Sequence, residues 1–247
     1  MISVRLCGAS ALTESDVRAL AESVAGGCCT VHLFGGLGDI LGSGFQTEVG
    51  IITVRHVLEP YLVGEATLAP TSFIRIVPLK GQVAVLLDRV QMVSRNYDVA
   101  VLPRVEVLKD LPLGSSRDMK VGDDVVVLAS PETVERGITA YAASGRIIAT
   151  AYTTPDIVLY EIPVLPGSSG GAVVNTAGEV VAVNVMRLHL PDGRVAGAGL
   201  WVDAVKAALE GTIRKPEELE VAVGGVPWTH VVAGGVAAAL VLSLLKR

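Results

Sequence analysis

A short glycine-rich stretch around Ser169 constrains this chain more than any other part of it. Residues 165–172 read LPGSSGGA, with two serines among glycines and apolar runs on either side. Glycine permits a sharp turn that other residues resist. Such a turn would aim the Ser169 hydroxyl outward and leave the N–H groups of Gly167 and Ser169 open to an oxyanion, as a nucleophilic serine needs. Alone, the stretch is also typical of a loop between strands, so its meaning depends on partners.

Two candidate partners lie upstream, each at the edge of an apolar run. His56 follows the β-branched residues 51–54, and Asp98 precedes the apolar residues 99–102. A histidine beside a strand is often structural, and an aspartate before a strand is often a turn residue. The three residues nevertheless occur together, in the order His56, Asp98, Ser169, each at the edge of an expected strand. The chain is also long enough for two small β-barrels. We therefore predict a triad in which Ser169 attacks, His56 moves the proton and Asp98 orients the imidazole.

Further motifs surround these three residues. GSGF at 42–45 and GIIT at 50–53 precede the histidine, and YDVAVL occupies 97–102. LGSS at 113–116 and VGDDV at 121–125 come next, and the serine stretch continues as GSSGGAVVN at 167–175 and GEVVAVN at 178–184. Together, across residues 15–210, these motifs resemble the HtrA/DegP-like serine protease domain, which has the trypsin fold of the chymotrypsin clan.

The resemblance implies an all-β fold of two six-stranded antiparallel β-barrels, chymotrypsin/trypsin-like, with short flanking helices. It implies a serine endopeptidase that hydrolyses peptide bonds through His56, Asp98 and Ser169 and an acyl-enzyme intermediate. Gly167 and Ser169 would form the oxyanion hole. The resemblance also implies a pocket for the side chain of the substrate residue that directly precedes the cleaved peptide bond. The residues implied to line this pocket are Pro163, Val164, Ala182, Val183, Asn184 and Val185. Since none of them is acidic, we expect a preference for small or medium apolar side chains.

The chain departs from the family pattern in a few places. Val54-Arg55 stands where the family usually has Asn-Ala, and Ser168 stands where it usually has asparagine. Neither change removes a catalytic group. Only a short stretch follows residue 209, so we expect no PDZ domain of the kind that usually follows in this family. We therefore do not carry over PDZ-based regulation, and the oligomeric state stays open.

Two other functions compete with the endopeptidase. Residues 167–171 also satisfy Gly-x-Ser-x-Gly, the motif of α/β-hydrolase esterases. That fold needs its histidine after the serine, where only His189 and His230 occur, and this chain lacks alternating strands and helices. The other alternative is a catalytically silent, membrane-tethered binding module that has kept the trypsin fold.

The helical, strand, turn and uncharged stretches, taken in order along the chain, predict five segments. Residues 1–27 form an N-terminal segment with a short helix, begun by Thr13 and Asp16 and leaning on the first barrel. Residues 28–105 form the first barrel, and 106–212 hold a linker, the second barrel and a closing helix at 202–209. A linker at 213–226 precedes a C-terminal anchor at 227–247. The expected strands are 30–34, 44–54, 73–77, 82–93, 99–102, 124–128, 138–149, 157–162, 172–174, 179–186 and 195–201, with a hairpin turn at 192–193.

Composition excludes several classes of function. A hydrophobic content of 51% supplies a core, and a net charge of −5 without a basic block gives no reason to expect a nucleic-acid partner. The three cysteines do not form a spaced framework, so disulfides are not expected. The four histidines are scattered, and we predict no metal and no cofactor. The expected partners are protein or peptide substrates.

The C-terminal stretch differs in kind from the rest. Residues 221–245 contain no Asp, Glu, Lys or Arg, and Lys246-Arg247 closes the chain. The run from Trp228 to Leu245, at about 1.5 Å per residue, is long enough to cross most of a hydrocarbon core. We predict a single-pass C-terminal membrane anchor; a buried C-terminal helix or strand is the alternative. Residues 1–10 show no secretory signal, which favours barrels facing the cytosol, whereas the terminal basic pair prefers the cytosolic side itself.

Overall fold

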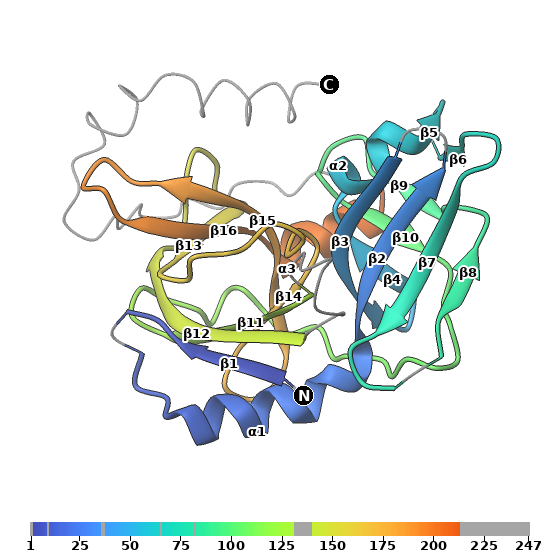
Figure 1. The fold of residues 1–247 in the computed structure, drawn as a ribbon. Helices are drawn as coiled ribbons and strands as arrows, with labels where there is room; N and C mark the ends of the chain where they lie inside the picture. Colours follow the sequence, from blue (N-terminus) through green and yellow to red (C-terminus); the bar gives the residue numbers. More distant parts are fainter. Residues whose placement is uncertain are drawn as a thin grey trace.

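The computed structural model describes residues 2–212 apart from residues 9, 36–37, 65, 82 and 131–139. Two β-sheet bodies lie side by side, and helix α1 (Glu14–Val24) runs along the second of them (Figure 1). The first body is a half-barrel and the second is a closed six-stranded barrel. The all-β fold with short flanking helices is therefore confirmed. The first sheet, however, stays open among the described residues, where the sequence predicted a second closed barrel.

The half-barrel is an antiparallel sheet in the order β8-β7-β2-β3-β4-β10-β9. After β4 the chain forms the short helix α2 (Arg55–Leu58), the 3₁₀ turn η2 (Glu59–Tyr61) and the hairpin β5 (Leu62–Val63) and β6 (Thr67–Leu68). The strands of the sheet are β2 (Cys28–Gly35), β3 (Gly38–Thr47), β4 (Gly50–Thr53), β7 (Phe73–Pro78), β8 (Val85–Leu87), β9 (Met92–Val93) and β10 (Ala100–Leu102).

The closed barrel follows the order β12-β11-β14-β15-β16-β13, and β13 pairs again with β12 to complete the ring. Helix α3 (Val202–Leu209) follows the last strand, as the sequence predicted. The hairpin turn at 192–193 is also confirmed, since Gly193 has a φ of +83° and Leu190 N–H donates to Arg194 O. The strands are β11 (Asp124–Ala129), β12 (Ala140–Ala149), β13 (Ile157–Tyr160), β14 (Ala172–Val174), β15 (Val180–His189) and β16 (Val195–Trp201).

The N-terminal segment packs differently from the prediction. Strand β1 (Ile2–Leu6), which the sequence analysis did not expect, pairs in parallel with β12 on the outside of the ring. Helix α1 begins at the predicted capping box, in which Thr13 and Asp16 bond each other's backbone N–H groups. Its buried face contacts β1, β11 and β12. The helix therefore leans on the second body and not on the first, because β1 attaches there and the helix follows it directly.

The strands of the closed barrel are buried on both faces. Val126 and Leu128 of β11 belong to a core cluster that extends into the half-barrel, whereas Val125 and Val127 belong to a second cluster within the second body. Successive side chains of a strand point to opposite faces, so the run VVVL supplies both clusters. Each fully buried Val or Leu contributes about 1.5–3 kcal/mol relative to an exposed one. The shared cluster holds the two bodies together.

A buried glutamine holds the connection between the two bodies. The side chain of Gln46 on β3 accepts from Val105 N–H (2.8 Å) and donates to Leu108 O (2.9 Å). Leu111 N–H donates to the main-chain oxygen of the same residue (2.8 Å). The linker is thereby fixed against the half-barrel.

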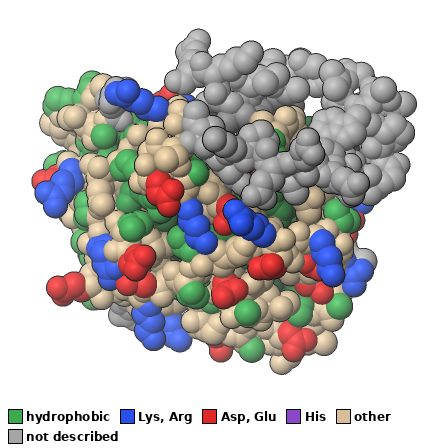
Figure 2. Space-filling model, turned by 180° about the vertical axis from the view of Figure 1, so that it is seen from behind, with side chains coloured by type: hydrophobic (Ala, Val, Ile, Leu, Met, Phe, Trp, Pro, Cys, Tyr) green, Lys and Arg blue, Asp and Glu red, His purple; other side chains and the backbone are tan. Residues whose placement is uncertain are grey.

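The helices of the described chain and its charged surface bear on membrane association. Within residues 2–212, no described helix is long and apolar enough to cross a bilayer. The predicted linker at 213–226 and anchor at 227–247 lie outside the described residues. On the face seen in Figure 2, acidic and basic side chains are interspersed, so that face has no large field of one sign.

Candidate active site

The pairing of β4 with β10 brings His56 and Asp98 together. These strands are antiparallel, with Thr53 opposite Ala100, so the end of β4 lies beside the start of β10. His56 stands just after β4 in the first turn of α2, and Asp98 stands just before β10. One carboxylate oxygen, Oδ2, lies 2.6 Å from His56 Nδ1, and the other, Oδ1, accepts from the backbone N–H of His56 (2.9 Å). This double attachment fixes the orientation of the imidazole.

The environment of Asp98 keeps its carboxyl group ionised. Its side chain is buried, and burial alone would raise its pKa, but the hydrogen bonds and charge of His56, with the charge of Arg55, hold the pKa below its ordinary value. An ionised carboxylate can only accept, so Nδ1 of His56 must carry the proton. In the neutral imidazole, Nε2 is then the acceptor, which is the tautomer that a general base requires.

The serine loop between Val164 and β14 is held by its carbonyl groups. Gly167 O accepts from the Ser43 hydroxyl (2.8 Å), and Ser169 O accepts from Ser43 N–H (2.7 Å). Gly170 has a φ of +89°, and a Cβ there would lie 2.1 Å from Ser43 O. Only glycine fits at that position, because the loop approaches β3 so closely.

The N–H groups of the same loop are used unequally. Those of Ser168, Gly170 and Gly171 donate to main-chain oxygens of Leu165, Asn184 and Ser168, at 3.0, 2.7 and 3.0 Å. In the described part of the chain, the N–H groups of Gly167 and Ser169 donate to no protein group. These two are the pair that the sequence predicted for an oxyanion hole. The loop is therefore able to accept an anion without breaking an existing hydrogen bond.

The serine and histidine segments meet at Gly42 and Ser43 on β3. A Cβ at Gly42 would lie 2.7 Å from Val57 Cγ1 and 3.3 Å from Ser169 O, so the residue after His56 and the main chain of the serine both lie close to Gly42. The Ser169 hydroxyl donates to Val185 O (3.0 Å), and among the described residues it makes no hydrogen bond to His56. Rotation about the Cα–Cβ bond redirects a serine hydroxyl among staggered positions, and such contacts often tighten only with substrate.

The residues predicted to line a substrate pocket occupy different environments. Val164, Ala182, Val183 and Val185 are buried. Pro163 is partly exposed and lines a groove of about 410 Å³ with Cys7, Arg194 and others. Asn184 is fully buried, and its side chain bonds Tyr160 and Ser168. Of the predicted set, only Pro163 is not buried.

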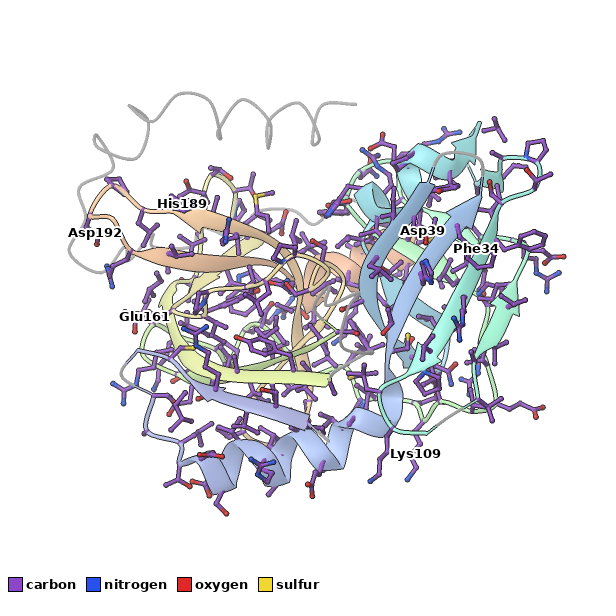
Figure 3. All side chains as sticks on the ribbon, viewed as in Figure 1. Phe34, Asp39, Lys109, Glu161, His189 and Asp192 are labelled. Atoms are coloured by element: carbon purple, nitrogen blue, oxygen red, sulfur yellow. The ribbon has the colours of Figure 1, made fainter. Side chains whose placement is uncertain are left out.

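Of the two histidines downstream of the serine, His189 lies apart from the site, and His230 lies outside the described residues. His189 is exposed on β15, in the outer hairpin whose tip carries Asp192 (Figure 3). Arg194, on the same hairpin, bonds Asp192 (2.7 Å) and Glu161 (2.8 Å) at the rim. The histidine that is paired with a buried carboxylate is His56. The antiparallel strands of the two bodies also lack the alternating strand and helix order that the α/β-hydrolase fold requires.

Two residues of the site were not singled out by the sequence. Ser43 belongs to the GSGF motif, but its hydroxyl could only be assigned to Gly167 O once β3 was placed beside the serine loop. Tyr160 lies within the predicted strand 157–162, at the end of β13, and carries no local signal of function. Among the described residues, no group of three or more His, Cys, Asp or Glu could hold a metal ion.

The fold and the site together define a protein of the trypsin-like class, with a half-barrel and a closed barrel meeting at a His-Asp pair and a glycine-rich serine loop. The chain belongs to the trypsin-like peptidase domain family, whose model matches residues 42–183.

One curated relative is similar to the chain in sequence, and two solved structures share its fold. A probable periplasmic serine endoprotease DegP-like of Pseudomonas fluorescens is 42% identical over 153 residues, which cover 58% of this chain and 29% of the relative. The structure of the HtrA-type protease AlgW with tripeptide has a TM-score of 0.59 and 20% identity, covering 78% of this chain and 61% of the other. The inactive form of Rv3671c from Mycobacterium tuberculosis also has a TM-score of 0.59 and 20% identity, with coverages of 83% and 95%. The chain spans less than a third of the length of the Pseudomonas relative.

Proposed function

We propose that this chain is a serine endopeptidase in which Ser169 is the nucleophile, His56 the general base and Asp98 the orienting acid. One observation carries the proposal. A buried Asp98 fixes His56 through two hydrogen bonds, and the serine loop, which meets the histidine segment at Gly42, leaves two N–H groups uncommitted. Membership of the trypsin-like peptidase family and the 42% identity to a DegP-like endoprotease support the same function.

The proposed reaction has two halves. The Ser169 oxygen bonds to the substrate carbonyl carbon while its proton passes to Nε2 of His56. The N–H groups of Gly167 and Ser169 receive the negative charge that develops on the carbonyl oxygen, and one such donor is typically worth about 2.7–4 kcal/mol. The C–N bond then breaks, His56 protonates the leaving amine, and an acyl group remains on Ser169. A water molecule repeats the sequence and releases the acid.

We further propose a preference for small or medium apolar side chains before the cut. Val185 lies beside the serine, since its carbonyl accepts from the Ser169 hydroxyl (3.0 Å). Neither it nor the neighbouring predicted pocket residues 163–164 and 182–184 is acidic, so a cationic side chain would find no partner among them.

Labelling by a fluorophosphonate, followed by peptide hydrolysis, tests the function. We expect the full chain to react covalently, and to cleave peptides with valine or alanine before the cut at least about tenfold better than matched peptides with lysine or aspartate. Absence of both reactions from a folded protein would instead favour a silent binding module. Cleavage of esters but not of peptides would favour an esterase.

We also propose that residues 227–247 tether the protease to a membrane, on the evidence of the uncharged run at 221–245. The full chain should float with phosphatidylcholine vesicles in a density gradient. Leu240→Lys should reduce flotation several-fold, because a lysine at mid-span costs about 2.5–3.5 kcal/mol. Leu219→Lys makes the same change outside the run and should float normally. Equal flotation of both variants would contradict the tether.

A further inference from the structure

Asn184 forms a buried hydrogen-bond network behind the serine loop. Its side chain is fully buried, and its Nδ2 donates to Ser168 O (2.9 Å) and Ser168 Oγ (3.1 Å). Its Oδ1 accepts from the hydroxyl of Tyr160 (2.6 Å), which is itself fully buried. A buried amide is costly unless hydrogen-bonded, and these contacts satisfy both ends of this one.

The surroundings of the network are shaped to hold it. A Cβ at Gly197 would lie 2.2 Å from Tyr160 Cε2, and a Cβ at Gly199 would lie 3.2 Å from Tyr160 Cε1, so two glycines of β16 make room for the ring. The pairing of β15 with β16 shifts register between Asn184 and Met186. Such bulges re-aim a side chain and are frequent near active sites. Burial raises the pKa of Tyr160, so its hydroxyl keeps the proton that it donates.

Planarity of the peptide links this network to the oxyanion hole. The Ser168 carbonyl and the Ser169 N–H belong to one trans peptide group, so they point in opposite directions. Asn184 Nδ2 and Gly171 N–H both hold that carbonyl, at 2.9 and 3.0 Å. Holding the carbonyl on the protein side turns the Ser169 N–H to the other side, where it has no protein partner in the described chain.

We propose that Asn184, oriented by Tyr160, is a positioning residue that aims the Ser169 N–H at the developing oxyanion. The inference rests on the proposed endopeptidase function and gives Asn184 a role other than lining the substrate pocket. It acts through the Ser168 carbonyl and touches no substrate. Its effect is therefore on the transition state, where the oxyanion forms, and not on ground-state binding.

Tyr160→Phe is the sharpest test, because it removes only the hydroxyl that orients the amide. We expect kcat for a cleavable peptide to fall about tenfold, less than the 10²–10³ typical of losing a whole oxyanion donor. KM should stay within about twofold, and the affinity of a peptide boronate, which is tetrahedral when bound, should fall in parallel with kcat. Tyr152→Phe makes the same change at a tyrosine of the same body outside the network, and should leave all three values unchanged.

Asn184→Asp provides a second variant. It keeps the shape and the acceptor for Tyr160 but places a carboxylate oxygen against Ser168 O, and kcat should fall at least about 100-fold. Thermal unfolding of each variant checks that it is folded at the assay temperature. An unchanged kcat in Tyr160→Phe, with an active wild type, would overturn the inference.

Hydrogen exchange at the serine loop separates this inference from the proposed function. In Tyr160→Phe, the amides of residues 168–171 should exchange several-fold faster than in wild type, while those of β14 remain protected. This result is expected whether or not the wild type hydrolyses peptides. An inactive wild type with accelerated exchange would refute the protease and retain the positioning role, and unchanged exchange would refute the role itself.

Discussion

Ser169→Ala should lower kcat/KM for peptide hydrolysis by about 10⁴-fold or more, to the level of residual catalysis by the oxyanion hole and binding alone. This hydroxyl belongs to the residue that carries one of the two uncommitted N–H groups, and its main chain and Val57, the neighbour of His56, both lie close to Gly42. Covalent labelling by a fluorophosphonate should disappear as well. Initial rates and intact-mass measurement of the labelled protein check both effects.

Ser168→Ala is the matched control for this loss. The Ser168 hydroxyl is buried and donates to Leu165 O (2.5 Å), so it points into the loop and away from substrate. We expect its removal to keep fluorophosphonate labelling and to cost less than about tenfold in kcat. The hydroxyl's bonds to Leu165 O and from Asn184 Nδ2 are lost, but Asn184 and Gly171 still hold the Ser168 carbonyl. If labelling vanished in Ser168→Ala and persisted in Ser169→Ala, the assignment of the nucleophile would be wrong.

Asp98→Asn should lower kcat by about 10⁴-fold with little change in KM. An asparagine amide can donate to Nδ1 of His56, which would move the ring proton to Nε2 and remove the acceptor that the serine needs. The effect should be far smaller in Asp39→Asn, which alters the surface pair His32–Asp39 at 3.4 Å. Steady-state kinetics of both variants checks this, and comparable losses would show that the site is not centred on Asp98.

The same variant should also change how stability depends on pH. The pKa of Asp98 lies below its ordinary value of 3.8, so the folded state binds this proton more weakly than the unfolded chain does. The ionised Asp98 carboxylate therefore stabilises the fold at pH values above its ordinary pKa of 3.8. This contribution to the free energy of unfolding disappears as the pH falls through the lowered pKa. Urea unfolding should show wild type more stable than Asp98→Asn near pH 7, with the difference shrinking below pH 4. A difference that grew on acidification would contradict the sign.

Local sequence patterns determined much of this protein. Alternating apolar runs marked most of the strands, and the pairing of Thr13 with Asp16 marked the start of α1, because strand period and helix capping depend on residues close together in the chain. The motifs around His56, Asp98 and Ser169 could be recognised from the sequence for the same reason, because each is a few residues long and stands at the end of a strand.

Only the tertiary structure decided how distant segments combine. No local pattern could place β1 beside β12, which lies 138 residues further along the chain at Ile2 and Ala140, or move α1 to the second body. The same holds for Ser43, which bonds Gly167 across 124 positions, and for Tyr160, which bonds Asn184 across 24. A single hydroxyl or amide has many possible partners, and only the register of the sheets and the packing of the two bodies select one. Asn184 illustrates this. The sequence placed it in a strand expected to line the substrate pocket. The direction of its side chain, however, depends on a bulge in β15 and on the space that two glycines of β16 leave for Tyr160.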